Sequence, residues 1–227
     1  MARSKKYEEV VKLLEPNKKY TLDEAIELVK KTSTTTFDST IELHVRLGID
    51  PKKGDQQVRA TITLPHTASK PKRVAAFVDE AHEKEAKDAG ADLVGGEELI
   101  AKIKTSGKIE FDEAVALPQM MPKLASIAKV LGPKGLMPSP KNETVGPDIT
   151  KMVTELKQGK ISYKNDDTSN LHLTVAKVSF DDAEVKENLV AVLDSIKRNR
   201  PQTTKGVFIK KIALATTMGP SIEIIYE

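Results

Sequence analysis

The chain has 227 residues, no cysteine, and 36 Lys and Arg residues against 33 Asp and Glu. A formal net charge of +3 does not identify a partner, and the lack of cysteine excludes disulfides and thiolate-bound metals. No apolar stretch is long enough to span a bilayer or form a signal peptide, which predicts a cytoplasmic protein without a membrane partner. The histidines are scattered and lack the spacing of a helical zinc site, so no metal is predicted; they are His44, His66, His82 and His172.

The first part of the chain is predicted to contain two helices and two strands. Apolar residues recur at helical spacing over residues 7–14 and 22–29. Apolar and polar residues then alternate over residues 37–47 and 58–64, which is typical of half-buried strands. Because the turn-forming residues 50–55 lie between them, we expect these two strands to pair antiparallel.

Strands and helices alternate in the middle of the chain, after a polar connector at residues 65–71. Strands are predicted at 74–78, 93–94 and 114–117, and helices at 79–89, 97–104, 123–131 and 148–157. This alternation indicates a parallel α/β sheet with right-handed crossovers.

After Gly159 the alternating pattern of the first part returns. A strand is predicted around Leu171 to Val175, a helix at 182–198, and strands at 207–215 and 222–226. These strands cannot easily extend the parallel sheet, because the last helix of the middle part completes it. We therefore expect them to pair with the strands at 37–47 and 58–64. The chain is therefore predicted to have two domains, an outer α+β domain of residues 1–67 and 159–227 and an inserted α/β domain of residues 68–158.

The predicted division concentrates the excess positive charge in the outer domain. That domain has 22 basic and 19 acidic residues, whereas the insert has 14 of each. Two connectors join the domains, and interfaces between domains are usually small, so we expect a hinge there.

The insert lacks the motifs of a nucleotide-binding enzyme. It contains no G-x-G-x-x-G after its first strand and no phosphate-binding P-loop, and no G-x-S-x-G elbow occurs in the chain. Gly95 and Gly96 are followed by Glu97 and Glu98, whose charges would repel a phosphate. We therefore predict that the protein is not an enzyme, has no catalytic residues and carries no cofactor.

A basic segment without acidic residues lies between Asp194 and Glu223 and contains Lys205 and Lys210. A stretch of one charge sign creates a positive potential that attracts phosphate. It ends at Thr217, Met218 and Gly219, where the glycine permits close approach and the threonine offers a hydroxyl. The alternative is a basic strand followed by an ordinary Gly-Pro turn.

A second region without acidic residues extends from Ala114 to Asn142. Its Gly- and Pro-rich loop, residues 131–140, is surrounded by lysines that include Lys134 and Lys141. These lysines could contact a phosphate backbone, as a secondary RNA contact. The alternative is a stiff connector with solvated lysines.

The aromatic content is low, with five Phe, four Tyr and no Trp. This argues against a protein that stacks successive bases of a single strand and favours one that recognises folded RNA. In that setting the carboxylate of Glu42 could accept hydrogen bonds from a guanine edge. The alternative is an exposed carboxylate paired with Lys or Arg across the sheet.

Three unusual motifs occur in the order Thr36–Leu43, Val130–Pro138 and Thr216–Ser221. With them the chain resembles, over essentially its whole length, the bacterial ribosomal protein L1 family, the stalk proteins of the large ribosomal subunit. The resemblance implies an outer α+β domain of split βαβ type and an inserted Rossmann-like, three-layer α/β/α domain without a nucleotide. It also implies three RNA partners: stalk-region rRNA, exit-site tRNA whose release the protein assists, and its own operon mRNA, whose translation it represses.

By the same resemblance, the contacts with rRNA and mRNA are expected at Phe37, Thr40, Glu42, Thr217, Met218 and Gly219, with His172 on a neighbouring strand. Lys205 and Lys210 would add salt-sensitive affinity. Two departures from the family pattern stand out. The connector has Thr67-Ala68-Ser69 where the family often has glycines, and Ser169 replaces a usual glycine before Asn170.

Two other functions remain as alternatives. One is a small-molecule-binding α/β enzyme with an accessory domain, and the other is a DNA-binding repressor.

Overall fold

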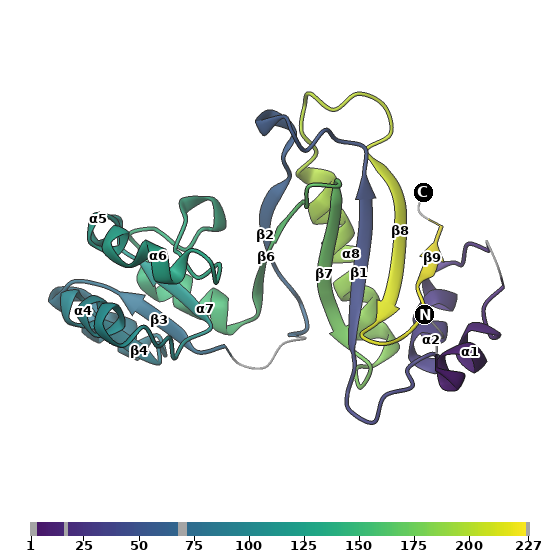
Figure 1. The fold of residues 1–227 in the computed structure, drawn as a ribbon, viewed down its shortest axis with the longest axis horizontal. Coiled ribbons are helices and arrows are strands. Elements are labelled where there is room, and N and C mark those ends of the chain that lie inside the picture. The colour runs from purple at the N-terminus through teal and green to yellow at the C-terminus, as the bar shows by residue number, and fades with distance from the viewer. Residues whose placement is uncertain (1–3, 16–17, 68–71, 226–227) are drawn as a thin grey trace. The chain divides into compact units, whose positions relative to one another are not determined.

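The computed structural model describes residues 4–15, 18–67 and 72–225. It contains both helices and β-sheets, as predicted (Figure 1). The chain forms two compact units, the outer unit of Met1–Ala68 with Tyr163–Glu227 and the insert of Ser69–Ser162. Ala68 and Ser69 of the connector, and Tyr226 of the last predicted strand, lie outside the described residues.

The outer unit contains a four-stranded sheet in the order β7-β1-β8-β9. Its elements are α1 (Lys5–Val11), α2 (Leu22–Lys31), β1 (Thr40–Leu47), β2 (Arg59–Thr63), β7 (Asn170–Lys177), α8 (Asp182–Arg198), β8 (Ile209–Thr216) and β9 (Ile222–Ile224). Both β7 and β8 run antiparallel to β1, so they are parallel to each other with α8 as their connection. This is a βαβ unit whose two strands are separated by β1.

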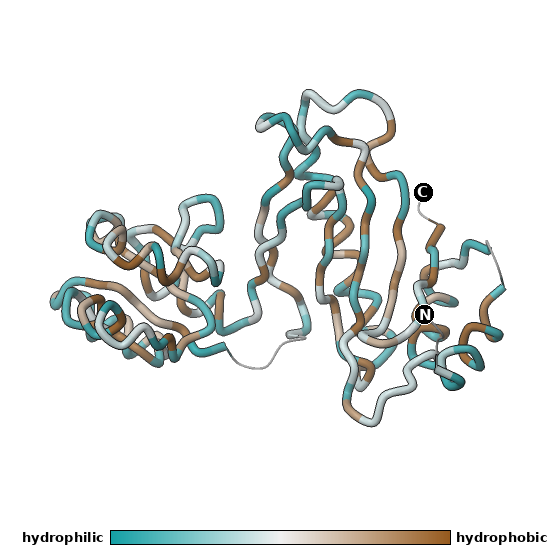
Figure 2. Tube along the Cα trace, viewed as in Figure 1, coloured by the Kyte–Doolittle hydropathy of each residue, from teal (hydrophilic) through white to brown (hydrophobic). Residues whose placement is uncertain are grey.

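Two helices cover one face of this sheet. Contacts join α8 to β7 and α2 to β8 and β9, and the two helices also contact each other. The residues of β1 that face these helices, such as Ile41, Leu43 and Val45, are buried, whereas the alternate residues are partly or fully exposed. Figure 2 shows the corresponding alternation of hydropathy along the strands. Within the described part of the outer unit, the other face of the sheet carries the alternate, partly exposed side chains of β1.

The strand at 58–64 does not pair with the strand at 37–47, so the predicted antiparallel pairing is wrong. Both edges of β1 are already hydrogen-bonded, one to β7 and the other to β8. Instead, β2 forms a two-stranded sheet with β6 (Lys160–Lys164), a strand that the sequence did not predict. The Asn165 Oδ1 atom accepts from the Val58 N–H at 2.8 Å next to this pair.

The insert is built on a parallel three-stranded sheet in the order β4-β3-β5. Its elements are β3 (Val74–Phe77), α3 (Glu83–Asp88), β4 (Leu93–Gly95), α4 (Glu97–Ser106), β5 (Glu113–Ala116), α5 (Met121–Leu124), α6 (Ala128–Leu131) and α7 (Ile149–Lys157). All four residues of β3 are buried, so both faces of the central strand are covered. The predicted parallel α/β arrangement of this segment is confirmed.

Two helices of the insert are shorter than predicted. The segment 79–89 begins with a 3-10 turn at Glu80–His82 before α3. The segment 123–131 is divided into α5 and α6 by another 3-10 turn, Ala125–Ile127. Within that segment, Ser126 Oγ donates to the Lys123 carbonyl at 2.8 Å, a local bond that competes with regular helix.

Candidate nucleic-acid interface

The start of β1 and the turn after β8 lie side by side. The Thr217 N–H donates to the Thr40 carbonyl at 3.1 Å, and Thr217 Oγ1 accepts from the Thr40 N–H at 3.2 Å. The strand register continues from this contact, with Ile41 opposite Thr216. Two predicted site segments that are 177 residues apart in the sequence are thus fixed to each other by hydrogen bonds.

Two large apolar side chains are exposed at this junction. Phe37 is 57% exposed and Met218 is 65% exposed. The alternation predicted that Phe37 begins the strand, and this is wrong. In the structure Phe37 lies in the loop before β1, where Thr35 Oγ1 donates to its carbonyl at 2.9 Å. We call Phe37, Thr40, Thr217, Met218 and Gly219 the turn site.

Gly219 is required by packing beneath the turn. A Cβ atom at this position would lie 2.2 Å from Thr216 Oγ1, far closer than van der Waals contact. Thr216 itself is buried, and its Oγ1 atom has no hydrogen-bond partner among the described residues. The glycine thus lets the turn close directly over β8.

The open face of the sheet carries a row of titratable side chains. Glu42 Oε2 lies 3.8 Å from His44 Nε2, His44 Nδ1 lies 2.8 Å from His172 Nδ1, and His172 Nε2 lies 3.7 Å from Asp166 Oδ2. We call Glu42, His44, His172 and Asp166 the sheet-face row. It crosses from β1 to β7, because the register places His44 opposite His172.

The alternative that pairs Glu42 with Lys or Arg across the sheet does not fit the register. Its neighbours on the adjacent strands are Thr174 and Ala215. The titratable group beside Glu42 is instead His44, two positions along the same strand.

The surroundings shift two pKa values in the sheet-face row. Burial lowers the pKa of His44, and the neighbouring His172 lowers it further, while Glu42 acts in the opposite direction. The pKa of Asp166 falls to about 2, because Thr168 Oγ1 and the N–H groups of Thr168 and Asn170 donate to its carboxylate. Asp166 is therefore a fixed negative charge at neutral pH.

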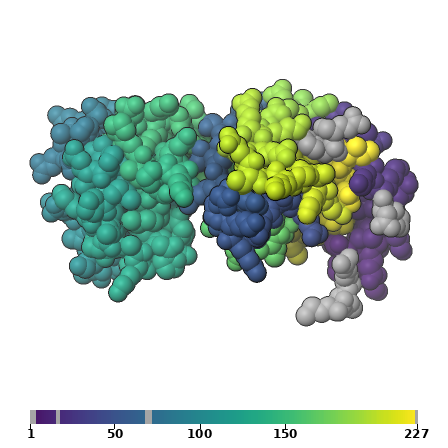
Figure 3. Space-filling model, turned by 90° about the horizontal axis from the view of Figure 1, so that it is seen from above, coloured from purple at the N-terminus to yellow at the C-terminus, as the bar shows by residue number. Residues whose placement is uncertain are grey.

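The lysines of the basic segment lie at the other end of the sheet from the turn site. Lys210 is near the start of β8, and Lys205 is in the loop before it, whereas Thr217 follows the end of β8 (Figure 1). That loop packs against the chain after β1, where the Gly48 N–H donates to the Phe208 carbonyl at 2.6 Å. Figure 3 shows these two segments, in yellow-green and blue, side by side. These two lysines thus lie at and before the start of β8, away from the turn site that follows its end.

The two lysines of the second region without acidic residues belong to the insert, and both are exposed. Lys134 precedes Gly135, whose φ of +71° forms a tight turn after α6. Lys141 lies in a 3-10 turn, Pro140–Asn142.

Sequence reasoning did not single out His44 and Asp166. His44 occupies a solvent-side position in the alternation of β1, which is the one available signal, but its partner His172 is 128 residues away. Asp166 is placed beside His172 by the turn that precedes β7. This turn ends at Ser169, which has a φ of +67°. That conformation explains why glycine would suit position 169.

The crevice at the carboxyl ends of β3 and β4 is where open α/β sheets bind nucleotides. Here five of its lining residues are acidic and two are basic: Asp79, Glu80, Glu83, Glu97, Glu98, Lys102 and Lys123. This excess of negative charge repels phosphate groups. The crevice is therefore unsuited to the nucleotide of the enzyme alternative.

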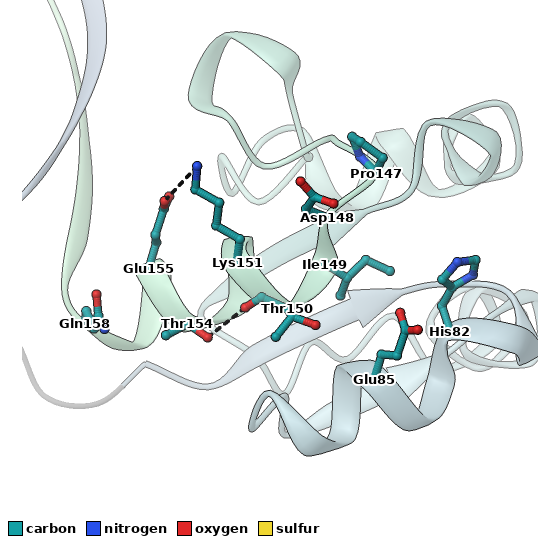
Figure 4. A pocket seen from close by; sticks show the side chains of 10 residues that line it. All are labelled: His82, Glu85, Pro147, Asp148, Ile149, Thr150, Lys151, Thr154, Glu155 and Gln158. Carbon is teal, nitrogen blue, oxygen red and sulfur yellow. Dashed lines mark hydrogen bonds and ion pairs between the residues drawn. The ribbon is translucent and has the colours of Figure 1, made fainter.

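A second hollow of the insert lies beside the start of α7 (Figure 4). Two of its charged side chains pair with each other, since Lys151 lies 3.9 Å from Glu155. Thr154 Oγ1 donates to the Thr150 carbonyl at 2.7 Å. Within the described ranges, no cluster of His, Asp or Glu side chains could hold a metal ion. None of the helices in those ranges is long and apolar enough to cross a membrane.

The turn site and the sheet-face row together form an open, polar surface with exposed apolar side chains at one end. A surface of this kind suits a large partner better than a small molecule, which proteins usually hold in a cavity. Comparison with known proteins makes the assignment specific. Residues 29–220 match the model of the ribosomal protein L1p/L10e family, and the chain belongs to this family.

Individual relatives are similar over nearly the whole chain. Large ribosomal subunit protein uL1 of Mycoplasma capricolum is 49% identical over 97% of this chain and 97% of the relative. The uL1 protein of Fervidobacterium nodosum is 49% identical over 97% of this chain and 94% of its own length. That of Kosmotoga olearia is 48% identical over 99% and 97%. The chain is thus a ribosomal protein of the cytoplasm, a structural component and not an enzyme, as predicted.

Proposed function

We propose that this chain, as a constituent of the large ribosomal subunit, binds a folded segment of the stalk-region rRNA through the turn site and the sheet-face row. The observation that carries the proposal is the junction of Thr40 with Thr217, which places the exposed side chains of Phe37 and Met218 at one end of an open polar sheet face. A preformed surface of this kind suits an irregular RNA fold, which offers unstacked bases and a distinctive backbone.

Within this surface the residues have different roles. Met218 and Phe37 supply apolar contact area that is already exposed before binding, and Gly219 keeps the backbone accessible. Glu42 accepts hydrogen bonds from base edges. Lys205 and Lys210, at the far end of β8, supply attraction to phosphate that depends on salt concentration.

We propose two further RNA partners from the same family relationship. The protein assists the release of deacylated tRNA from the exit site, with Lys134 and Lys141 of the insert as secondary RNA contacts. It also binds its own operon mRNA through the surface that binds rRNA, and so represses translation. The mobility that tRNA release requires would come from the two connectors between an outer domain, residues 1–67 and 159–227, and a Rossmann-like insert, residues 68–158.

The test is a salt-titrated binding assay of the full chain with the stalk rRNA hairpin and a perfect duplex of matched length. Met218→Asp should weaken hairpin binding by about tenfold or more, because it places a charge against RNA at an exposed contact. Val190→Asp is the matched control, since Val190 is also an exposed apolar residue but lies on α8. The Val190→Asp variant should bind the hairpin with an affinity within about twofold of the wild-type value, because its new charge lies away from the proposed contact surface.

Lys205→Ala should lower the slope of log K against log salt by about one while preserving the preference for the hairpin. Equal losses for Met218→Asp and Val190→Asp would contradict the proposed location of the surface. Duplex DNA that competes as well as the hairpin at equal salt would favour the DNA-binding alternative.

A further inference from the structure

The two histidines of the sheet-face row are directly opposed on adjacent strands. Their Nδ1 atoms are 2.8 Å apart, and the ring planes meet at 64° with centroids separated by 5.0 Å. At this distance one Nδ1 atom must carry the hydrogen and the other must present its lone pair. Both rings cannot be protonated at once while the contact lasts, so the pair can take up one proton but not two.

Each ring also faces a carboxylate through its second nitrogen. Glu42 lies 3.8 Å from His44 Nε2, and Asp166 lies 3.7 Å from His172 Nε2. A carboxylate stabilises a protonated Nε2 and is repelled by its lone pair. The ring that donates through Nδ1 is therefore stabilised when its Nε2 atom is protonated as well, which makes that ring a cation.

The solvent exposure of the two rings indicates which one becomes the cation. The His172 side chain is 55% exposed, whereas that of His44 is 32% exposed. Because the charged form is better solvated at the more exposed position, His172 takes the proton and donates to His44. The lowered pKa of His44 agrees with its role as the neutral acceptor.

Two other carboxylates on or beside this face have lowered pKa values. Asp166 remains ionised, since its pKa is about 2. Arg46 extends the row on β1, next to Lys211 on β8. Lys211 pairs with Glu223 of β9 at 2.6 Å, which lowers the pKa of that carboxyl group. The histidine pair is the part of the sheet-face row whose Nδ1 contact allows uptake of one proton.

We propose that His44 is a positioning residue of the RNA-binding surface. Through the Nδ1 contact it holds His172 as a cation, whose Nε2–H lies beyond hydrogen-bond distance of Asp166 and is left to donate to an acceptor on the RNA. The inference rests on the proposed function and adds a dependence on pH to it. Proton uptake reduces the negative charge of the sheet-face row from two to one, and it orients the cationic ring. Since the bound state favours the protonated pair, affinity for folded RNA increases as the pH falls.

The experiment measures binding of the full chain to the stalk rRNA hairpin at pH 5.8, 6.8 and 7.8 and constant ionic strength. The wild-type chain should bind about three- to tenfold tighter at pH 5.8 than at pH 7.8, within the limit set by uptake of one proton. His172→Gln should bind with nearly the same affinity at pH 5.8 and pH 7.8. His44→Leu should lose most of the wild-type ratio of affinities, whereas His44→Gln should retain it, because the amide oxygen can still accept from His172.

The chain provides its own controls, because it has four histidines and two lie outside this surface. His66→Gln and His82→Gln should keep the wild-type ratio, since His66 contacts Glu187 of α8 and His82 lies in the insert. A wild-type ratio in His172→Gln or in His44→Leu would overturn the inference. So would pH-independent affinity of the wild-type chain.

A second measurement separates this inference from the proposed function. Ring-proton resonances of the free protein report the titration of both histidines without RNA. Substitution of His44 should change the titration of His172, and independent titration of the two rings would overturn the pairing even if RNA binds tightly. Absence of hairpin-selective binding at every pH, with coupled titration intact, would instead contradict the proposed function and the RNA role of the pair together.

Discussion

At the scale of single residues, Gly219 connects local geometry with the binding surface. Its missing side chain allows the turn to close over Thr216, whose Oγ1 atom would otherwise meet a Cβ at 2.2 Å. Because that hydroxyl has no hydrogen-bond partner among the described residues, it occupies space without contributing a bond. The two positions should therefore be energetically coupled.

We predict that Gly219→Ala displaces the turn and weakens hairpin binding by about tenfold, as a shift of a positioned contact does. Adding Thr216→Ala should restore most of the affinity, because it removes the clashing oxygen without breaking a hydrogen bond. A double-mutant cycle of binding free energies measures the effect. Additive losses of binding free energy in the double variant would show that the clash between the new Cβ and Thr216 Oγ1 does not displace the turn.

Ser169 combines an unfavourable backbone conformation with useful bonds. Its φ of +67° is disfavoured for residues with a Cβ, while its Oγ atom donates to the Ile49 carbonyl at 3.0 Å. Its carbonyl also accepts from the Leu47 N–H at 2.8 Å. Strain and hydrogen bonding therefore oppose each other at this position.

We predict that Ser169→Gly leaves the free energy of unfolding within about 0.5 kcal/mol, because relief of strain and loss of one hydrogen bond are each worth about 1 kcal/mol. Ser169→Ala should cost about 1 kcal/mol, since it loses the bond and keeps the strain. Urea unfolding of the three proteins gives the comparison. Greater loss in the glycine variant than in the alanine variant would refute this balance.

At the scale of elements, α8 anchors the chain where it leaves β2. Asn188 is completely buried on this helix, and its side chain accepts from the His66 N–H at 3.0 Å and donates to the His66 and Val175 carbonyls at 2.8 and 2.9 Å. One amide thus joins α8, β7 and the segment that precedes the insert. It uses three of the four bonds available to it.

Asn188→Ala should reduce the free energy of unfolding by about 3 kcal/mol, because it leaves buried backbone groups without partners. Glu187→Gln is a suitable control one position away. Glu187 contacts His66 Nε2 at 2.8 Å from an exposed position, so its loss should cost less than about 1 kcal/mol. Chemical denaturation of both variants tests the difference, and equal effects would argue against a structural role of the buried amide.

The elements differ in how well the sequence predicted them. The alternation of Ile41, Leu43 and Val45 located β1, because one face of that strand is buried. The strands predicted after Gly159 were expected to pair with β1, and β7 and β8 do so, whereas β9 pairs with β8 instead. β6 was missed since its five residues contain two lysines and form a narrow two-stranded sheet. The turn site followed from motifs, whereas the contact of His44 with His172 depends on strand register across 128 residues.

At the scale of the whole molecule, the insert has a hydrophobic core of its own. That core extends from Val74 to Leu156 and includes the buried strands β3 and β5. The outer unit is built instead around residues such as Ile41, Leu171 and Val192. Because neither set of buried side chains depends on the other, each unit should unfold as its own cooperative unit.

We predict two calorimetric transitions for the full chain. Val115→Ala should lower the midpoint of one by roughly 5 to 10 °C and leave the other unchanged, since it opens a small cavity in the insert. Val192→Ala should do the reverse in the outer unit. A single transition that both variants shift equally would show that the units unfold together.

The central position of β1 also has a consequence for biosynthesis. Both of its neighbours, β7 and β8, follow the insert in the chain, so its edges stay unpaired while more than a hundred further residues are synthesised. At about 5 to 20 residues per second this delay lasts roughly 6 to 25 seconds, during which the insert can fold first. The turn site and the sheet-face row are therefore completed only after β8 has been made. A nascent chain that stops earlier cannot compete with finished molecules for their RNA.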